Sequence, residues 1–261
     1  MTLIIGIKCK DGIVMASDGA ATWGSMGQST AQQPTKKLNV LRDKIVIGVS
    51  GPVGLGQLLT GGMETMWDKG DLSGKRPYEA MALISKMFRE YIVPELQVAQ
   101  VARNAIGNAG LTSAISATLV ALPVSKKLCL FQFDQQGAPE QATPELPFVC
   151  IGSGQSIADP FLALLKRVFW SDHQPTIGEG LFAAVWTLDH AIKVNAGGVA
   201  EPMQVITVSE GEMLKELGAG EMSDHREAVK NAEQTMKDSL LRFKKIVSIG
   251  ESITEEIPQP G

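Results

Sequence analysis

Two short apolar runs at the start of the chain, 3–9 and 13–17, constrain the fold more than any other feature. They are joined by a turn that contains Asp11-Gly12. Asp-Gly between apolar runs strongly favours a hairpin, because both turn positions take a positive φ. The first residues of the chain are therefore expected to lie in a sheet. A second pair of apolar runs predicts another hairpin, at 38–41 and 45–50.

The rest of the chain alternates between helical and strand-like blocks. Apolar residues at helical spacing predict helices, at 54–67, from Pro77 onward, at 156–170 and at 180–193. Pro94 is expected to kink or end the second of these helices. Short apolar runs predict strands, at 118–123, 127–133, 148–151 and 203–208. Segregated blocks of this kind indicate an α+β fold, with sheets inside and helices layered outside.

The last fifty residues have a different character. Residues 223–247 are charged and prone to form a helix, with Ser223 as a candidate N-cap. Residues 250–261 are acidic and are expected to form a flexible tail. The sequence therefore predicts a main domain over 2–209 and a C-terminal extension over 210–261.

Composition excludes several classes of function. The hydrophobic fraction of 44% and charged fraction of 20% are those of a soluble globular protein. The net charge of −4 gives no basic surface for nucleic acid, and neither a signal peptide nor a membrane span is expected. The three cysteines, Cys9, Cys129 and Cys150, form no metal or redox motif. No metal or cofactor is expected, and widely spaced cysteines favour a reducing, cytoplasmic location.

Thr2 is the best candidate for a catalytic residue. The three histidines, His173, His190 and His225, lie in no catalytic motif. A small residue at position 2 permits removal of Met1, which would leave a hydroxyl and an α-amine on one residue. An α-amine titrates at about 7.7–8.0, so it can act as a general base near neutral pH. Thr2 is thus a candidate nucleophile activated by its own amine.

Further segments share a pattern with Thr2 and the apolar run that follows it. They are 17–24 (SDGAATWG), 36–38 (KKL), 49–51 (VSG) and 151–154 (IGSG). In this order and spacing, the set resembles the proteasome β-subunit family and its bacterial relative, the HslV protease, from Thr2 to about Val208. The SDGAATWG block is more similar to HslV. The long chain with its tail is similar to the proteasome homologue described from betaproteobacteria.

The resemblance implies a role for each matching residue. Thr2 would be the nucleophile, and its amine would accept the proton. Lys37 would favour the deprotonated amine and alkoxide, and Asp18 would pair with Lys37. The Gly51 N–H would donate to the oxyanion, and Ser153 would hydrogen-bond near the terminal amine. Taken singly, each residue also has an ordinary structural explanation, such as a turn aspartate or a helix-capping serine.

Substrate contacts are implied in the same way. Thr22 would hold the substrate backbone in β-fashion, while Thr35 and Val49 would line a small, apolar side-chain pocket. About three extra residues between Gly24 and Lys37 predict a longer loop there, which could reshape this pocket.

The chain also departs from the family pattern. Lys193 and Ala196 stand where proteasomes usually place an aspartate and a serine that support the nucleophile.

The implied fold is the four-layer αββα sandwich of N-terminal-nucleophile hydrolases, within the α+β class. The implied function is hydrolysis of peptide bonds in peptides or unfolded proteins, inside a homo-oligomeric double ring, with an ATP-dependent unfoldase as a further partner. Two alternatives stay open. One is a small-molecule amidase of the same fold, which would be a monomer or dimer. The other is a catalytically silent ring or scaffold subunit, which would retain Met1.

Overall fold

The computed structural model describes residues 2–25, 28–106, 115–194, 198–211 and 214–254. The chain divides into two compact units, Met1–Leu217 and Gly218–Gly261. The first unit holds two five-stranded sheets, and every strand pair in them is antiparallel. The second unit contains one long helix, α6 (Ala219–Thr254).

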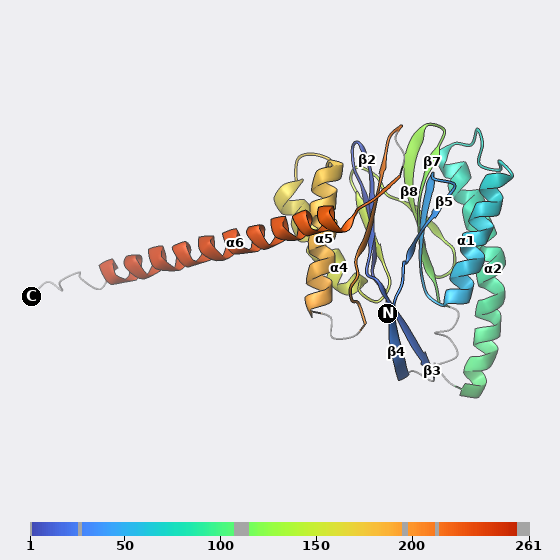
Figure 1. Ribbon diagram of the computed structural model, residues 1–261, viewed down its shortest axis with the longest axis horizontal. Helices are drawn as coiled ribbons and strands as arrows, with labels where there is room; N and C mark the ends of the chain where they lie inside the picture. The colour runs from blue at the N-terminus through green and yellow to red at the C-terminus, as the bar shows by residue number, and fades with distance from the viewer. Residues whose placement is uncertain (1, 26–27, 107–114, 195–197, 212–213, 255–261) are drawn as a thin grey trace, which may run out of the picture. The chain divides into compact units, whose positions relative to one another are not determined.

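The two sheets face each other in the first unit (Figure 1). The first sheet has the order β10-β1-β2-β11-β12, with β1 at Ile4–Lys8, β2 at Gly12–Ser17, β10 at Phe148–Ile151, β11 at Gln204–Ser209 and β12 at Lys215–Glu216. The second has the order β5-β6-β7-β8-β9, with β5 at Leu38–Leu41, β6 at Ile45–Ser50, β7 at Ala117–Val124, β8 at Lys127–Phe133 and β9 at Pro139–Gln141. The two predicted hairpins are confirmed as β1–β2 and β5–β6.

Helices cover the outer face of each sheet. Those on the second sheet are α1 (Val53–Asp68) and α2 (Pro77–Ile106), and those on the first are α4 (Gln155–Phe169) and α5 (Ile177–Val194). The layers are therefore helix, sheet, sheet, helix (Figure 1). The predicted α+β class and αββα sandwich are confirmed.

Alternation along β1 shows why the sheets are buried on both faces. Ile4 faces the second sheet and packs in one core with Leu119 and Leu130. Ile7 points to the opposite face, where α5 approaches closely: a Cβ added at Gly180 would lie 3.6 Å from Ile7 and 2.8 Å from Cys9 Sγ. Since neighbouring side chains of a strand point to opposite faces, a strand buried between sheet and helix is apolar at nearly every position.

A second core lies between the second sheet and its helices. Phe88 of α2 meets Phe133 of β8 edge to face, with ring centroids 4.8 Å apart. Both rings are fully buried, and such pairs contribute beyond the area that they bury. This core fixes α1 and α2 against the sheet and so fixes the start of α1, which borders the site described below.

The predicted loop before Lys37 is instead a hairpin of two strands, β3 (Ala20–Ser25) and β4 (Gln28–Pro34). They pair antiparallel, and the register shifts between Trp23 and Gly24. The segment is rich in polar residues and glycine, so hydrophobic alternation does not reveal strands that backbone pairing holds together.

Two helices extend past a proposed boundary. Of the two outcomes expected at Pro94, a kink or an end, the helix α2 does not end there: it continues to Ile106, and Pro94 lies on its exposed side, where the Glu90 carbonyl that loses its helical partner can be solvated. The helix α6 reaches Thr254, so residues 250–254 are helical rather than part of a tail. Residues 255–261 lie outside the described part of the chain.

Candidate active site

Thr2 is held by the turn that follows β10. Its backbone N–H donates to Ser153 Oγ at 3.2 Å, and its carbonyl accepts from the Gly154 N–H at 3.1 Å. Gly152 has φ +99°, and a Cβ there would lie 2.2 Å from the Thr2 carbonyl oxygen. Only glycine fits so close to the backbone in that conformation. The IGSG segment therefore cradles the residue that the sequence singled out.

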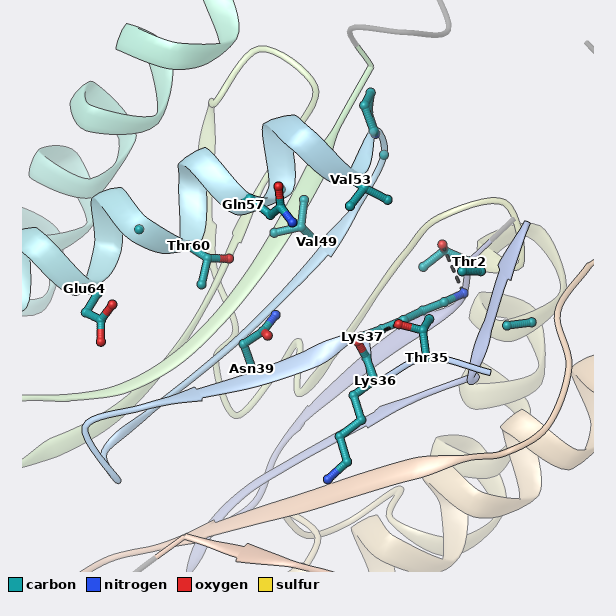
Figure 2. Close-up of a pocket in the computed structure, with 16 residues that line it drawn as sticks. Thr2, Thr35, Lys36, Lys37, Asn39, Val49, Val53, Gln57, Thr60 and Glu64 are labelled. Atoms are coloured by element: carbon teal, nitrogen blue, oxygen red, sulfur yellow. Dashed lines mark hydrogen bonds between the residues drawn. The ribbon is translucent and has the colours of Figure 1, made fainter. Parts of the chain in front are cut away.

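Lys37 joins Thr2 to a buried carboxylate. Its Nζ lies 3.2 Å from Thr2 Oγ1 (Figure 2). It also lies 2.7 and 2.9 Å from the two carboxylate oxygens of Asp18. The side chains of Lys37 and Asp18 are only 8% and 0% exposed. Asp18 follows β2 and Lys37 precedes β5, so the two sheets bring the pair together.

Asp18 is also tied to the surrounding backbone. Its carboxylate accepts the N–H groups of Leu3 at 2.8 Å, Ala20 at 3.3 Å and Ala200 at 3.4 Å. These bonds hold the carboxylate in one orientation toward Lys37. Burial lowers the pKa of Lys37, and the charge and hydrogen bonds of Asp18 oppose that shift. The site thus holds a desolvated ammonium in a fixed position beside a hydroxyl.

Gly51 directly follows β6 and has φ +144°, and a Cβ there would lie 2.6 Å from the Ile115 carbonyl oxygen. Its place requires glycine for both reasons. Gly51 lines the same cavity as Thr2, and α1 starts two residues later, at Val53. The positive end of a helix dipole there favours negative charge that develops next to Gly51.

A cavity of about 560 Å³ opens beside Thr2. Four of its residues come from one face of α1, at the 4-3-4 spacing of a helix: Val53, Gln57, Thr60 and Glu64. Asn39 of β5 faces them (Figure 2). The cavity is therefore lined by polar as well as apolar residues: α1 contributes Gln57, Thr60 and Glu64 opposite Asn39, and Val49 and Val53 supply the apolar part.

The remaining predicted residues fall in different places. Thr35 and Val49 line the cavity with Thr2. Thr22 lies on β3 opposite Gln32, but its side chain lies outside what the structure describes. Lys193 lies in the last turn of α5 and pairs with Asp189 at 2.6 Å, and Ala196 lies outside the described residues.

Among the cavity residues that sequence analysis missed are the polar side chains of Asn39, Gln57, Thr60 and Glu64. Helical spacing alone places the last three on one face of α1. Their orientation toward β5 depends on how α1 packs on the sheet, which periodicity does not give.

Other chemistries have little support in the described residues. His190 stacks on Phe161 with ring centroids 4.4 Å apart, and His173 contacts Asp172 and Glu179 on the surface. The three cysteines are buried and free, and burial raises the pKa of Cys9 to about 12. Within the described ranges, no cluster of three or more His, Cys, Asp or Glu could hold a metal ion, and no helix has the length and apolar character needed to cross a membrane.

Comparison with known proteins agrees with this geometry. A family model described as "Proteasome subunit" matches residues 2–193. The chain belongs to the proteasome subunit family. This proteasome subunit is 29% identical over 196 residues to the proteasome subunit beta of Methanococcus maripaludis strain C5, which covers 75% of the chain and 78% of the relative. It is 31% identical over 98 residues to proteasome subunit beta 1 of Korarchaeum cryptofilum, covering 35% of the chain and 46% of the relative.

Solved structures share the fold of this proteasome subunit. The helical assembly of the Anbu complex from Pseudomonas aeruginosa has a TM-score of 0.67 at 18% identity, covering 99% of this chain and 98% of that one. A Gly-1 mutant of Anbu from Hyphomicrobium sp. strain MC1 has a TM-score of 0.65 at 17% identity, and each chain is covered fully. At these identities the similarity concerns the fold.

Proposed function

We propose that this proteasome subunit is a threonine endopeptidase whose nucleophile is Thr2 after removal of Met1. The observation that carries the proposal is the contact of 3.2 Å between Lys37 Nζ and Thr2 Oγ1, with Lys37 paired to a fully buried Asp18. A fixed ammonium next to a hydroxyl stabilises the alkoxide that forms during attack. The family roles of Thr2, Asp18, Lys37, Gly51 and Ser153 agree with this arrangement.

The reaction has two steps. Thr2 Oγ1 attacks the carbonyl carbon of the substrate, and its proton passes to the freed α-amine of Thr2. The tetrahedral oxyanion is stabilised by the N–H of Gly51, and such a donor lowers the activation barrier by about 3 kcal/mol. Cleavage of the C–N bond leaves an ester on Thr2, while the leaving amine takes the proton. Water, deprotonated by the same α-amine, then hydrolyses the ester.

The other parts of the proposal concern the substrate and the setting. The substrate is a peptide or an unfolded protein, held by Thr22 as an added strand, with a side chain in the cavity that Thr35 and Val49 line. The 2–209 segment is the catalytic domain, and 210–261 is an extension of it. The subunit forms a homo-oligomer, for which a double ring and a helical arrangement, as in the Pseudomonas aeruginosa Anbu structure, are the two forms to distinguish. It works in the cytoplasm, in agreement with its free thiols, and an ATP-dependent unfoldase supplies the chain to be cut.

Intact-mass measurement of the protein from its own host, followed by labelling with a peptide epoxyketone, tests the proposal. We expect a mass that lacks Met1 and one epoxyketone per chain. Thr2→Ala should abolish labelling and peptide cleavage, whereas Thr235→Ala, which changes an exposed threonine of α6, should change neither. Retention of Met1 would favour the silent subunit, and labelling of Thr2→Ala would exclude Thr2 as the nucleophile.

A further inference from the structure

Gln204 is a buried amide that makes contacts on both sides of the Lys37–Asp18 pair. It is the first residue of β11 and is 7% exposed. Its backbone is paired with Ser17 of β2, the residue before Asp18. Its side chain reaches the second sheet, where Oε1 accepts the Leu38 N–H at 3.0 Å and Nε2 donates to the Leu38 carbonyl at 3.1 Å. Leu38 is the residue after Lys37.

These two bonds replace a missing strand. β5 is the edge strand of the second sheet, and its Leu38 is paired on the inner side with Gly48 of β6. The outward N–H and carbonyl of Leu38 are almost fully buried, since Leu38 is 2% exposed. Buried backbone groups need partners, and the primary amide of Gln204 supplies one acceptor and one donor, as a neighbouring strand would.

A carboxylate extends the contact to the other side of Lys37. Glu216 Oε1 accepts the second N–H of Gln204 at 3.3 Å. Both oxygens of Glu216 accept from Lys36 Nζ, at 2.8 and 2.9 Å. The residues before and after Lys37 are therefore both anchored to the β11–β12 end of the first sheet. Of the two anchors, the buried amide of Gln204 on Leu38 is the stronger, since the Lys36–Glu216 pair is exposed.

We propose that Gln204, assisted by Glu216, is a positioning residue that sets where the Lys37 ammonium sits relative to Thr2 Oγ1. One side chain fixes the distance between the strand that delivers Asp18 and the strand that delivers Lys37. The positioning role rests on the proposed function of Thr2. The pair of hydrogen bonds from Gln204 to the Leu38 backbone, here called the clamp, can be tested without measuring activity.

The test compares Gln204→Met, which keeps the length of the side chain and removes its hydrogen bonds, with wild type. We expect the rate of epoxyketone labelling to fall about 10- to 100-fold, since small misplacements of a reacting group cost that much. KM for a peptide substrate should stay near that of wild type. The acid limb of the pH–rate profile should move to higher pH, because a displaced ammonium no longer disfavours protonation of the Thr2 amine. In hydrogen exchange, the Leu38 amide should change from slow to fast.

Ser85→Ala is the matched control. It removes a buried hydrogen bond of 2.6 Å to the Gly137 carbonyl in another part of the fold, so it reports general loss of stability. It should leave the labelling rate, the pH limb and the Leu38 exchange unchanged. If Gln204→Met does not fold, Glu216→Ala removes the outer anchor alone. It should slow labelling by about 3- to 10-fold, as expected for one lost hydrogen bond, and shift the pH limb in the same direction.

The outcomes separate the two proposals. The positioning role is overturned if wild type labels at Thr2 and the folded variant has the same labelling rate and the same acid limb of the pH–rate profile. That result leaves the protease proposal intact. Absence of wild-type labelling counts against the protease proposal. In that case slow exchange of Leu38 in wild type and fast exchange in Gln204→Met still supports the clamp, and equal exchange in both refutes it.

Discussion

At the scale of single residues, the site depends on a buried ion pair. Asp18 and Lys37 are both desolvated, and the Asp18 carboxylate has three backbone donors in addition to the ammonium. Removing one charge from such a pair leaves the other uncompensated in a medium that solvates it poorly. That cost is larger than the net contribution of the intact pair. Stability and chemistry are therefore coupled at these two residues.

Asp18→Asn should lower the free energy of unfolding by about 3–5 kcal/mol, because the Lys37 ammonium stays buried without its carboxylate. Adding Lys37→Met should recover part of this loss, while neither variant should label with an epoxyketone. Urea unfolding measures the first effect. Asp68→Asn, which breaks the exposed pair with Arg42, is the control and should leave the free energy of unfolding nearly unchanged. Strict additivity of the Asp18 and Lys37 changes would show that the two do not interact.

At the scale of elements, α1 and β5 form the cavity together. From Val53 to Glu64 the face of α1 that borders the cavity spans about 16 Å, at a rise of about 1.5 Å per residue. Lys37 lies at the Thr2 end, and Glu64 lies at the far end (Figure 2). The amides of Gln57 and Asn39 line the space between. A long side chain that donates hydrogen bonds fits this arrangement better than an aliphatic one.

Peptides with arginine before the cleaved bond should therefore be cut faster than peptides with leucine there. Gln57→Leu together with Asn39→Leu should lower the ratio of the two kcat/KM values about 10-fold, which is the effect of about 1.4 kcal/mol. Fluorogenic peptides that differ only at that residue provide the measurement. Leu58→Ala alters an exposed residue of α1 that does not line the cavity and should leave the ratio unchanged. A ratio that favours leucine in wild type would contradict this role of the cavity.

At the scale of the whole molecule, family membership points to assembly. A single type of chain carries Thr2, Asp18, Lys37, Gly51 and Ser153 together, so under the proposed function a homo-oligomer would hold every residue of the site. A ring-forming peptidase encloses its active sites in a chamber, whereas a small-molecule amidase is expected to be a monomer or dimer. The oligomeric state therefore distinguishes the peptidase from the amidase.

Native mass spectrometry of the processed protein should give a high-order homo-oligomer, with twelve or fourteen copies expected of a double ring of six or seven subunits, as in related assemblies. A peptide substrate should be cut and a stably folded protein should resist, because a chamber admits only extended chains. A monomer or dimer that cleaves small amides at the same rate as peptides would favour the amidase.

Several features of the fold were predictable from the sequence. Asp11-Gly12 and the apolar runs on either side of it gave the first hairpin, because turn chemistry and side-chain alternation are local. The order of blocks gave the layered class. The hairpin of β3 and β4 was not predictable, because polar strands are held by backbone pairing that leaves no apolar pattern. The passage of α2 through Pro94 depended on which side of the helix the proline occupies.

The same division holds at the site. By itself, the sequence determined that Thr2 could carry both nucleophile and base, and that Asp18, Lys37, Gly51 and Ser153 recur in family order. Those are properties of residue identity and spacing. Only the tertiary structure revealed the 3.2 Å contact between Lys37 and Thr2, the polar side chains that α1 presents to the cavity, and the hydrogen bonds of Gln204 to the Leu38 backbone. Each of these joins segments from different strands or helices, and packing between sheets and helices, rather than local preference, sets such distances.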